Sequence, residues 1–502
     1  MGSVRKLAGQ TLWYGVPTIA SRFLGYILSV FLFRWYGPEQ TADITQIYAI
    51  IPFLNVVYTY GLETAYFRFS TQESEQKLFN TLSISMLVST VLFSVVLLFF
   101  SGQLASWAAL SDHPEYFRWM LYILFFDSLS VVPFARLRQQ QRPRKYAFIK
   151  LFTVLLTLGI SYYYLRFCPQ AYAANPADPW LWFYRPEVGI GYYILANAVA
   201  SAAALLLLLG TWKGFSLQFD VALWQRVLKY SYPLILVGFG GMINEMLSRL
   251  IYIHVLDLPL EEEKRQLGIF GASYKVAVLI TIFIQVFRMA AEPFFFRQST
   301  ESHAPRTYAR VMKFFVIACC LMWLAIGLAL EPIARLAFGD NYAAYKDGAG
   351  IIPVLAMGSV FLGIYYNLSI WYKLTNRTWA GAWITLATAA LTAVLNIWWI
   401  PLFGYYGSAW ATFVCYLAMM LVSYRLGQRY YPVRYAWKKY TAYVVIAVAL
   451  YAVHTWLAAA WLQVPWQRWV AGLTLYSVFV ALIARVERRE LGGLPVVGRW
   501  FR

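Results

Sequence analysis

Long apolar runs separated by short polar segments follow one another along the whole chain. Many of these runs reach about 18 residues or more, the length that an α-helix needs to cross the hydrocarbon of a bilayer. The pattern predicts about fourteen transmembrane helices with short loops and no folded domain between them. The predicted spans are 9–33, 43–67, 80–101, 116–137, 146–167, 188–212, 229–255, 268–294, 311–331, 349–372, 379–400, 406–426, 440–461 and 468–486.

The loops differ in charge. Most of the 42 Lys and Arg lie at the N-terminus, in alternate loops and in the C-terminal tail, and the densest basic loop is 136–145. Basic loops stay on the cytoplasmic side, so both termini are expected in the cytoplasm. The first apolar run lacks a small-residue cleavage site and is expected to remain as a membrane span.

Composition also indicates a membrane protein, and it bears on which ligands and cofactors are expected. The 502 residues are 61% hydrophobic and only 13% charged, whereas soluble domains carry roughly twice that charge. The net charge of +19 is spread over loops rather than gathered in one tract, so a nucleic-acid surface is not expected. The four Cys show neither a disulfide framework nor metal-ligand spacing, and no metal or other cofactor is expected.

A short pattern occurs twice. Glu63 and Arg68 stand in Glu-x-x-x-Phe-Arg-x-Ser-Thr at the end of the second predicted helix, and Glu292 and Arg297 stand in the same pattern at the end of the eighth. An even number of helices separates the copies, which predicts two lobes in the same orientation. The expected fold is all-α, with lobes at 1–212 and 213–426 and two additional helices at 427–502.

Charged residues inside the spans are the candidate functional residues, because each is costly in hydrocarbon unless it is paired or hydrated. Arg22 and Lys275 have no acid three or four residues away on their own helices. Glu245 with Arg249, and Arg288 with Glu292, have the spacing for local ion pairs, which is the structural alternative to a functional role. A cavity containing Arg22, Arg249 and Lys275 would select anions such as phosphate.

One further acid, Asp127, lies within a predicted helix. Asp127 is expected to be buried in the fourth helix, and either it or Glu245 could bind a coupling H⁺ or Na⁺. Lys150 lies close enough to the predicted cytoplasmic boundary for its ammonium to reach the headgroups.

The chain resembles the bacterial polysaccharide-biosynthesis flippases, the O-antigen (Wzx-type) branch of the multidrug/oligosaccharidyl-lipid/polysaccharide superfamily. The resemblance rests on the helix count, the parallel halves, and two patches at 61–69 and 271–294. It implies a V-shaped inner-membrane transporter that moves an undecaprenyl-diphosphate-linked oligosaccharide to the outer leaflet by alternating access. Arg22, Arg249 and Lys275 would hold the diphosphate and Arg288 would receive it.

The repeated motif also suggests a gate, and the pathway suggests partners. Glu63, Arg68, Glu292 and Arg297 would exchange partners at an inner gate, although Arg68 and Arg297 could instead contact anionic headgroups. Besides the lipid-linked substrate and the bilayer, a polysaccharide polymerase and a chain-length regulator are expected partners, and the chain is expected to be a monomer.

Three other functions stay open. An ion-coupled multidrug antiporter has the same architecture, but an acid is expected in its first helix, where this chain has Arg22. A lipid II flippase of the MurJ type would also have a cationic cavity. An enzyme acting on lipid-linked sugars is disfavoured by the short outer loops and the scattered acids. The absence of a Gly-x-x-x-x-Gly-Lys-Ser/Thr motif from the sequence argues against ATP hydrolysis.

Overall fold

The computed structural model describes residues 20, 23–70, 72–176, 178–181, 183–299, 301, 303–375, 377–462 and 464–491, without the side chains of residues 290, 292, 293, 297 and 491. The described residues form helices and connecting turns, with no strand among them. They fall into two compact units. Unit 1 comprises residues 1–272, 343–345 and 385–408, and unit 2 comprises residues 273–342, 346–384 and 409–502.

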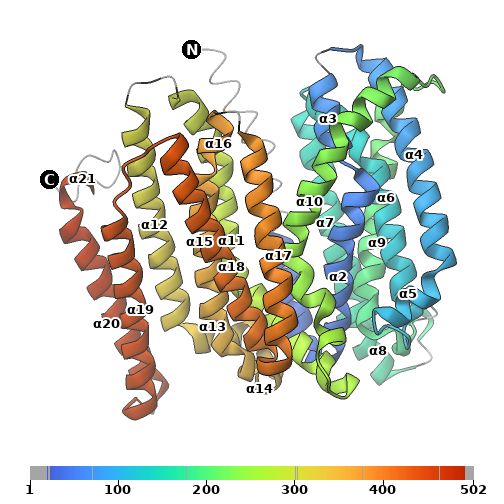
Figure 1. Ribbon diagram of the computed structural model, residues 1–502. Helices are drawn as coiled ribbons and strands as arrows, with labels where there is room; N and C mark the ends of the chain where they lie inside the picture. The colour runs from blue at the N-terminus through green and yellow to red at the C-terminus, as the bar shows by residue number, and fades with distance from the viewer. Residues whose placement is uncertain are drawn as a thin grey trace. The chain divides into compact units, whose positions relative to one another are not determined.

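Unit 1 is built mainly from the N-terminal helices, shown in blue to green in Figure 1. After a first helical stretch, Phe23–Trp35, its elements are α2 (Pro38–Thr59), α3 (Leu62–Phe69), α4 (Glu75–Phe99), α5 (Ser101–Trp107), α6 (Pro114–Gln139), α7 (Pro143–Tyr162), α8 (Cys168–Ala174), α9 (Tyr192–Leu208) and α10 (Val221–Val255). The helix α11 (Leu260–Gln298) begins in unit 1 and continues into unit 2 after Ala272.

Unit 2 contains most of the remaining helices. They are α12 (Ala304–Leu328), α13 (Leu330–Phe338), α15 (Ile352–Leu368), α16 (Ile370–Leu374), α19 (Trp437–Ala460), α20 (Pro465–Val486) and α21 (Arg488–Leu491). Three helices, α14 (Tyr342–Tyr345), α17 (Thr378–Phe403) and α18 (Tyr405–Tyr430), contribute residues to both units.

The membrane character predicted from hydropathy is confirmed. The thirteen predicted spans after the first fall mainly on helix, the described part of the first is helical from residue 23, and twelve helical spans within the described residues are long and apolar enough to cross a bilayer. Large apolar side chains also stay exposed on the outside of the helices. On α4, for example, Val88, Leu92 and Val95 are each more than half exposed, and Phe99 is 79% exposed. Such a surface is suited to lipid rather than to water.

The second predicted span, 43–67, is wrong as a single helix. The helix α2 ends at Thr59, and Tyr60 and Gly61 take left-handed backbone conformations with φ of 32° and 74° before α3 begins. Glycine adopts this conformation without the cost that a β-carbon imposes. The Gly61 backbone also lies against Leu234 of α10, where a β-carbon would come within 3.3 Å of the leucine side chain. The Glu63–Arg68 segment is therefore a separate short helix.

The boundaries of the two compact units differ from those of the predicted lobes. The helix α10, which the sequence places at the start of the second lobe, packs on α2, α3 and α4 within unit 1. Asn244 of α10 also donates to the Thr388 hydroxyl of α17 (3.2 Å) and accepts from the Thr392 hydroxyl (2.8 Å). Because compact units and sequence repeats are different divisions of a chain, the duplicated lobes stay a prediction.

The additional C-terminal helices α19 and α20 pack against α12 (Figure 1), and buried charges lie at one end of this group. The Lys313 ammonium of α12 contacts the carboxylates of Glu487 (2.7 Å) and Glu490, and Glu487 also accepts from Lys439 (2.7 Å) and Tyr443 (2.6 Å). Lys313 is 5% exposed and Glu487 is 2% exposed. Burial acts to raise the pKa of Glu487, but these hydrogen bonds outweigh it and lower the pKa to about 2.

A close approach at Gly268 gives a test of the packing in unit 1. A β-carbon on Gly268 would lie 1.9 Å from the carbonyl oxygen of Pro38, so Gly268→Ala must displace α2 from α11. We expect this variant to lose about 3 kcal/mol of stability or to fail to fold. Gly241→Ala on α10 is the matched control, since nothing lies within 4 Å of its added carbon. Thermal unfolding of the purified proteins measures both, and equal midpoints would refute the close contact.

The Glu487 carboxylate gives a pH-dependent stability. Its pKa is about 2 in the folded chain and 4.5 as an ordinary glutamate, so its contribution is complete above about pH 4.5 and is lost as the pH falls toward 2. Wild type should therefore be more stable than Glu487→Gln at pH 6, and the difference should shrink between pH 4.5 and 2. Unfolding midpoints at a series of pH values measure this, and a constant difference would contradict the assignment.

Candidate functional site

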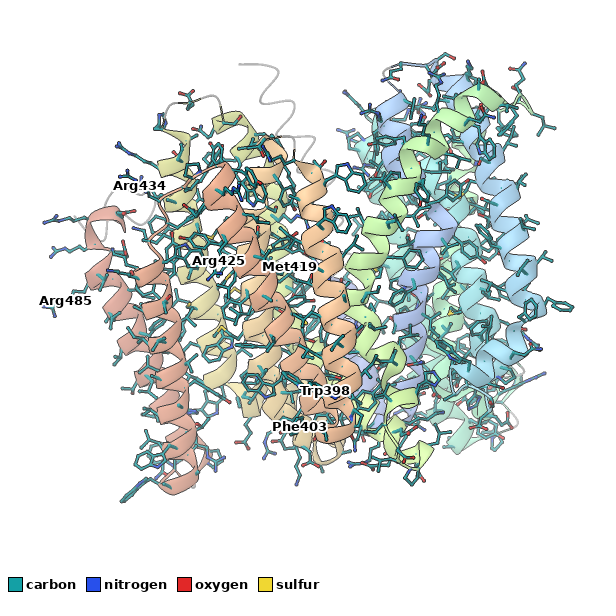
Figure 2. All side chains as sticks on the ribbon, in the orientation of Figure 1. Trp398, Phe403, Met419, Arg425, Arg434 and Arg485 are labelled. Carbon is teal, nitrogen blue, oxygen red and sulfur yellow. The ribbon has the colours of Figure 1, made fainter. Side chains whose placement is uncertain are left out.

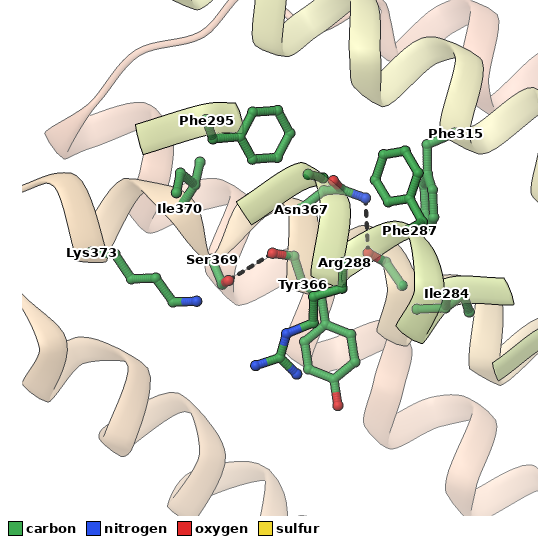
Figure 3. A pocket seen from close by; sticks show the side chains of 12 residues that line it. Ile284, Phe287, Arg288, Phe295, Phe315, Tyr366, Asn367, Ser369, Ile370 and Lys373 are labelled. Carbon is green, nitrogen blue, oxygen red and sulfur yellow. Dashed lines mark hydrogen bonds between the residues drawn. The ribbon is translucent and has the colours of Figure 1, made fainter. Parts of the chain in front are cut away.

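A small pocket in unit 2 is lined by two cations and a tyrosine. Arg288 of α11 places its guanidinium over the ring of Tyr366 of α15, with 4.4 Å between the guanidinium carbon and the ring centre. Lys373 of α16 lines the same pocket. Figure 3 shows the charged ends of Arg288 and Lys373 directed toward the same open region. A guanidinium and an ammonium on one pocket can share the oxygens of a phosphate or a carboxylate.

Local hydrogen bonds and packing hold the side of the pocket that carries Tyr366 and Lys373. Asn367 donates to the carbonyl of Gly363 (3.2 Å), and the Ser369 hydroxyl donates to the carbonyl of Tyr366 (2.7 Å), as Figure 3 shows. Gly363 allows the close approach of α12, since a β-carbon there would lie 2.7 Å from the ring of Phe315. The turn between α15 and α16 thus holds Tyr366 and Lys373 on a supported backbone.

Lys275, which the sequence marks as a phosphate ligand, lies on the same helix as Arg288. Its side chain is exposed, and the two residues stand thirteen positions apart on α11, about 20 Å along the axis. One phosphate group cannot bridge that distance. Lys275 and Arg288 can therefore contact the same substrate only at different points along it or at successive times.

Arg249 of α10 belongs to unit 1 and is buried, with 6% of its surface exposed. Its Nη1 donates to the carbonyl oxygen of Glu245 (3.4 Å) and lies 2.7 Å from the sulfur of Met246, and its guanidinium faces the ring of Phe270 at 5.8 Å. The alternative of an Arg249–Glu245 ion pair is wrong here. The hydrogen bond goes to the Glu245 backbone, and the Glu245 side chain is exposed.

Asp127 lies on α6, within one of the candidate membrane spans, and its burial there stays a prediction. It lies close to the Ser201 hydroxyl of α9 and interacts electrostatically with Lys150 of α7. Lys150 is only partly exposed and places its ammonium 4.3 Å from the ring centre of Phe134. Lys150 therefore belongs to an intramolecular cluster with Asp127.

The first copy of the repeated motif lies on α3. Glu63 forms an ion pair with Arg138 of α6, and the guanidinium of Arg138 also lies over the ring of Phe67 at 4.8 Å. Arg68 lies over the ring of Tyr230 of α10 at 4.8 Å. Both members of the Glu63–Arg138 pair are exposed, at 50% and 42% of their side chains. Exchange of partners by Glu63 and Arg68 would have to begin from these contacts.

Three predicted site residues lie outside the described side chains. Arg22 lies outside the described residues, and Glu292 and Arg297 lie on the described backbone of α11 but outside the described side chains.

Two residues of the candidate site, Lys373 and Arg138, were not predicted from the sequence. Lys373 directly follows a predicted span, and a Lys is common at the end of a transmembrane helix. Arg138 lies in the basic loop 136–145, which was used only to predict the side of the membrane on which the loops lie. No signal in the sequence links either one to its partner.

Comparisons with known proteins agree on the fold. The fold is similar to that of "Lipid II flippase MurJ, inward closed conformation" at 12% identity and a TM-score of 0.71, covering 94% of this chain and 98% of that one. It is also similar to an inward-facing "multidrug resistance MATE family transporter of the MOP superfamily" at 13% identity and a TM-score of 0.65, with 83% and 94% covered. A third match is a transporter of that superfamily from Pyrococcus furiosus (13% identity, 84% and 95% covered, TM-score 0.58).

These likenesses show that the chain shares its fold with transporters that include a member of the multidrug/oligosaccharidyl-lipid/polysaccharide superfamily. A family profile described as "Polysaccharide biosynthesis protein" matches residues 7–299, and the chain belongs to this family. No curated protein matches the sequence.

The Glu63–Arg138 pair gives a test of the gate. We expect Glu63→Arg and Arg138→Glu each to slow transport by placing like charges together, and the double variant to recover most of the rate. Exposed pairs contribute about 0–1 kcal/mol, so unfolding midpoints should barely change. Transport and thermal unfolding of the three variants measure this. A double variant as slow as the single ones would show that the pair itself is not used.

Proposed function

We propose that the chain is a flippase that moves an undecaprenyl-diphosphate-linked oligosaccharide from the cytoplasmic to the outer leaflet by alternating access, for polysaccharide or O-antigen export. The observation that carries the proposal is the pocket in which Arg288 and Lys373 lie together beside Tyr366. Its chemistry suits a diphosphate, and the family supplies the polysaccharide context.

The pocket also suits the rest of such a substrate. An aromatic face stabilises a guanidinium without adding negative charge, so the contact with Tyr366 leaves the attraction for an anion in place. Asn367 and Ser369 add polar groups near the cations. The diphosphate would bind here while the polyprenyl chain remains in lipid. Lys275 and the buried Arg249 would contact the headgroup at other stages of the cycle.

The proposal includes a location and a mode of action. The protein would lie in the bacterial inner membrane with both termini in the cytoplasm, act as a monomer without a bound cofactor, and deliver its product to a polymerase and a chain-length regulator. Asp127 and Glu245, both on helices of unit 1, are the candidates for coupling to H⁺ or Na⁺.

A flipping assay tests the pocket. Proteoliposomes would contain a fluorescent diphosphate-linked polyprenyl oligosaccharide, and an added glycosidase would report the fraction in the outer leaflet. Arg288→Gln and Lys373→Gln should each slow flipping by about tenfold or more, because each removes one charge-assisted contact to the diphosphate. The exposed Lys438→Gln on α19 is the control and should flip at the wild-type rate.

The outcomes separate the alternatives. Equal rates for the pocket variants and the control would remove Arg288 and Lys373 from the substrate site. If wild type moves only lipid II, the substrate is a peptidoglycan precursor. If it moves neither lipid but extrudes an organic cation along an ion gradient, it is an antiporter. A flipping rate that ignores both pH and sodium gradients would exclude Asp127 and Glu245 from coupling.

A further inference from the structure

A second cationic pocket lies in unit 2, at the end of the helix group α12, α19 and α20. It is a cavity of about 800 Å³ lined by residues from the first turns of α12, the segment before α19 and the helix α21. Figure 2 shows Arg434 and Arg485 near this end of the group. We call it the basic pocket. Its charged lining residues are Arg306, Arg310, Lys313, Arg434, Arg489 and Glu490.

The ion pairs of the pocket leave it with excess positive charge. Glu490, its one lining acid, contacts Lys313 and lies 3.4 Å from Arg310. Glu487 behind the pocket contacts Lys313 and Lys439. Among the described residues, no carboxylate forms an ion pair with the other three lining arginines, Arg306, Arg434 and Arg489. Three guanidinium groups therefore line one cavity, and no carboxylate among the described residues forms an ion pair with them.

The floor of the pocket is rigid. Lys313 and Glu487 are almost fully buried, and the Tyr440 hydroxyl of α19 donates to the carbonyl of Ala309 on α12 (3.0 Å). These contacts fix α12, α19 and the end of α20 to one another. A ligand that enters would meet arginines mounted on a framework that is already formed, which lowers the entropy cost of binding.

The position of the pocket points to a lipid. It lies where α12 and α19 begin and α20 ends, the level at which headgroups meet transmembrane helices. Within about two turns of the lining residues, the same helices expose apolar side chains to the membrane: Val445 and Val448 on α19 and Val486 on α20. Phosphate oxygens could thus bind the arginines while acyl chains lie along the helices.

We propose that the basic pocket binds the headgroup of an anionic phospholipid. Basic pockets between transmembrane helices are suited to such headgroups, because a phosphate accepts several charge-assisted hydrogen bonds from guanidinium groups. The bound phosphate would join α12 to α21 and to the segment before α19, and so hold the C-terminal helices on unit 2. This site is separate from the Arg288–Lys373 pocket and does not depend on the proposed transport function.

Native mass spectrometry of the full-length protein in detergent tests the proposal, with phosphatidylglycerol as the anionic probe and phosphatidylcholine as the zwitterionic one. Wild type should retain phosphatidylglycerol about tenfold more strongly. The triple variant Arg306→Gln/Arg434→Gln/Arg489→Gln should lose this preference. The control Arg425→Gln/Arg485→Gln/Arg488→Gln removes the same charge from exposed arginines of unit 2 that do not line the pocket, and should keep it.

A second triple variant, with lysine at positions 306, 434 and 489, keeps the charge and should keep much of the preference, even if the glutamine variant folds poorly. Equal retention of both lipids by wild type would overturn the proposal, as would a preference unchanged in the glutamine variant or lost equally in the control. Inorganic phosphate that competes as strongly as the lipid would show a general anion site instead. Retention of the diphosphate-linked substrate in place of phosphatidylglycerol would make this pocket part of the transport path.

Discussion

The absence of water in the hydrocarbon is the constraint on which the structure depends. Each backbone N–H and C=O must find a partner within the chain, which makes helices the economical solution for every span. The break between α2 and α3 shows how the rule is met at an interruption: the Tyr60 N–H donates to Val56, and the Ala65 N–H donates back to Gly61. The left-handed turn therefore leaves the hydrogen-bond ladder nearly continuous while it redirects the chain.

The same lack of water determines how buried charged side chains are stabilised. At the end of α12, α19 and α20, Lys313 and Glu487 are almost fully buried and neutralise each other, with Lys439 and Tyr443 completing the coordination of the carboxylate. Breaking such a pair strands a buried charge, so this cluster serves to hold helices together. Arg249 and Arg288 are held differently, against aromatic rings and backbone or thioether groups. An aromatic contact stabilises a guanidinium without adding an opposing charge.

Cations in contact with aromatic rings recur in both compact units. Arg68 lies over Tyr230, Arg138 over Phe67 and Arg288 over Tyr366, each with the guanidinium within 5 Å of the ring centre. Contacts of this kind are moderate in strength and tolerate sliding, whereas a buried ion pair resists separation. A transporter needs groups that bind an anion and then release it when the helices move. These three contacts are of the softer kind, whereas largely buried ion pairs occur in both units, such as Lys264–Asp43 in unit 1 and Lys313–Glu487 in unit 2.

The sequence by itself determined the membrane class and the helical spans, because about 18 consecutive apolar residues admit little else. It also located the repeated motif at the ends of two spans and marked Arg249, Lys275 and Arg288 as unusual. The tertiary structure alone decided which charges meet. Arg288 lies beside Lys373, Glu63 beside Arg138 and Lys313 beside Glu487, and each pair is 75 residues or more apart in the chain. Local spacing allowed a Glu245–Arg249 ion pair, yet Arg249 donates to the Glu245 carbonyl oxygen and the Glu245 side chain is exposed. Contacts between helices that are distant in sequence depend on how those helices pack, and no local pattern records that packing.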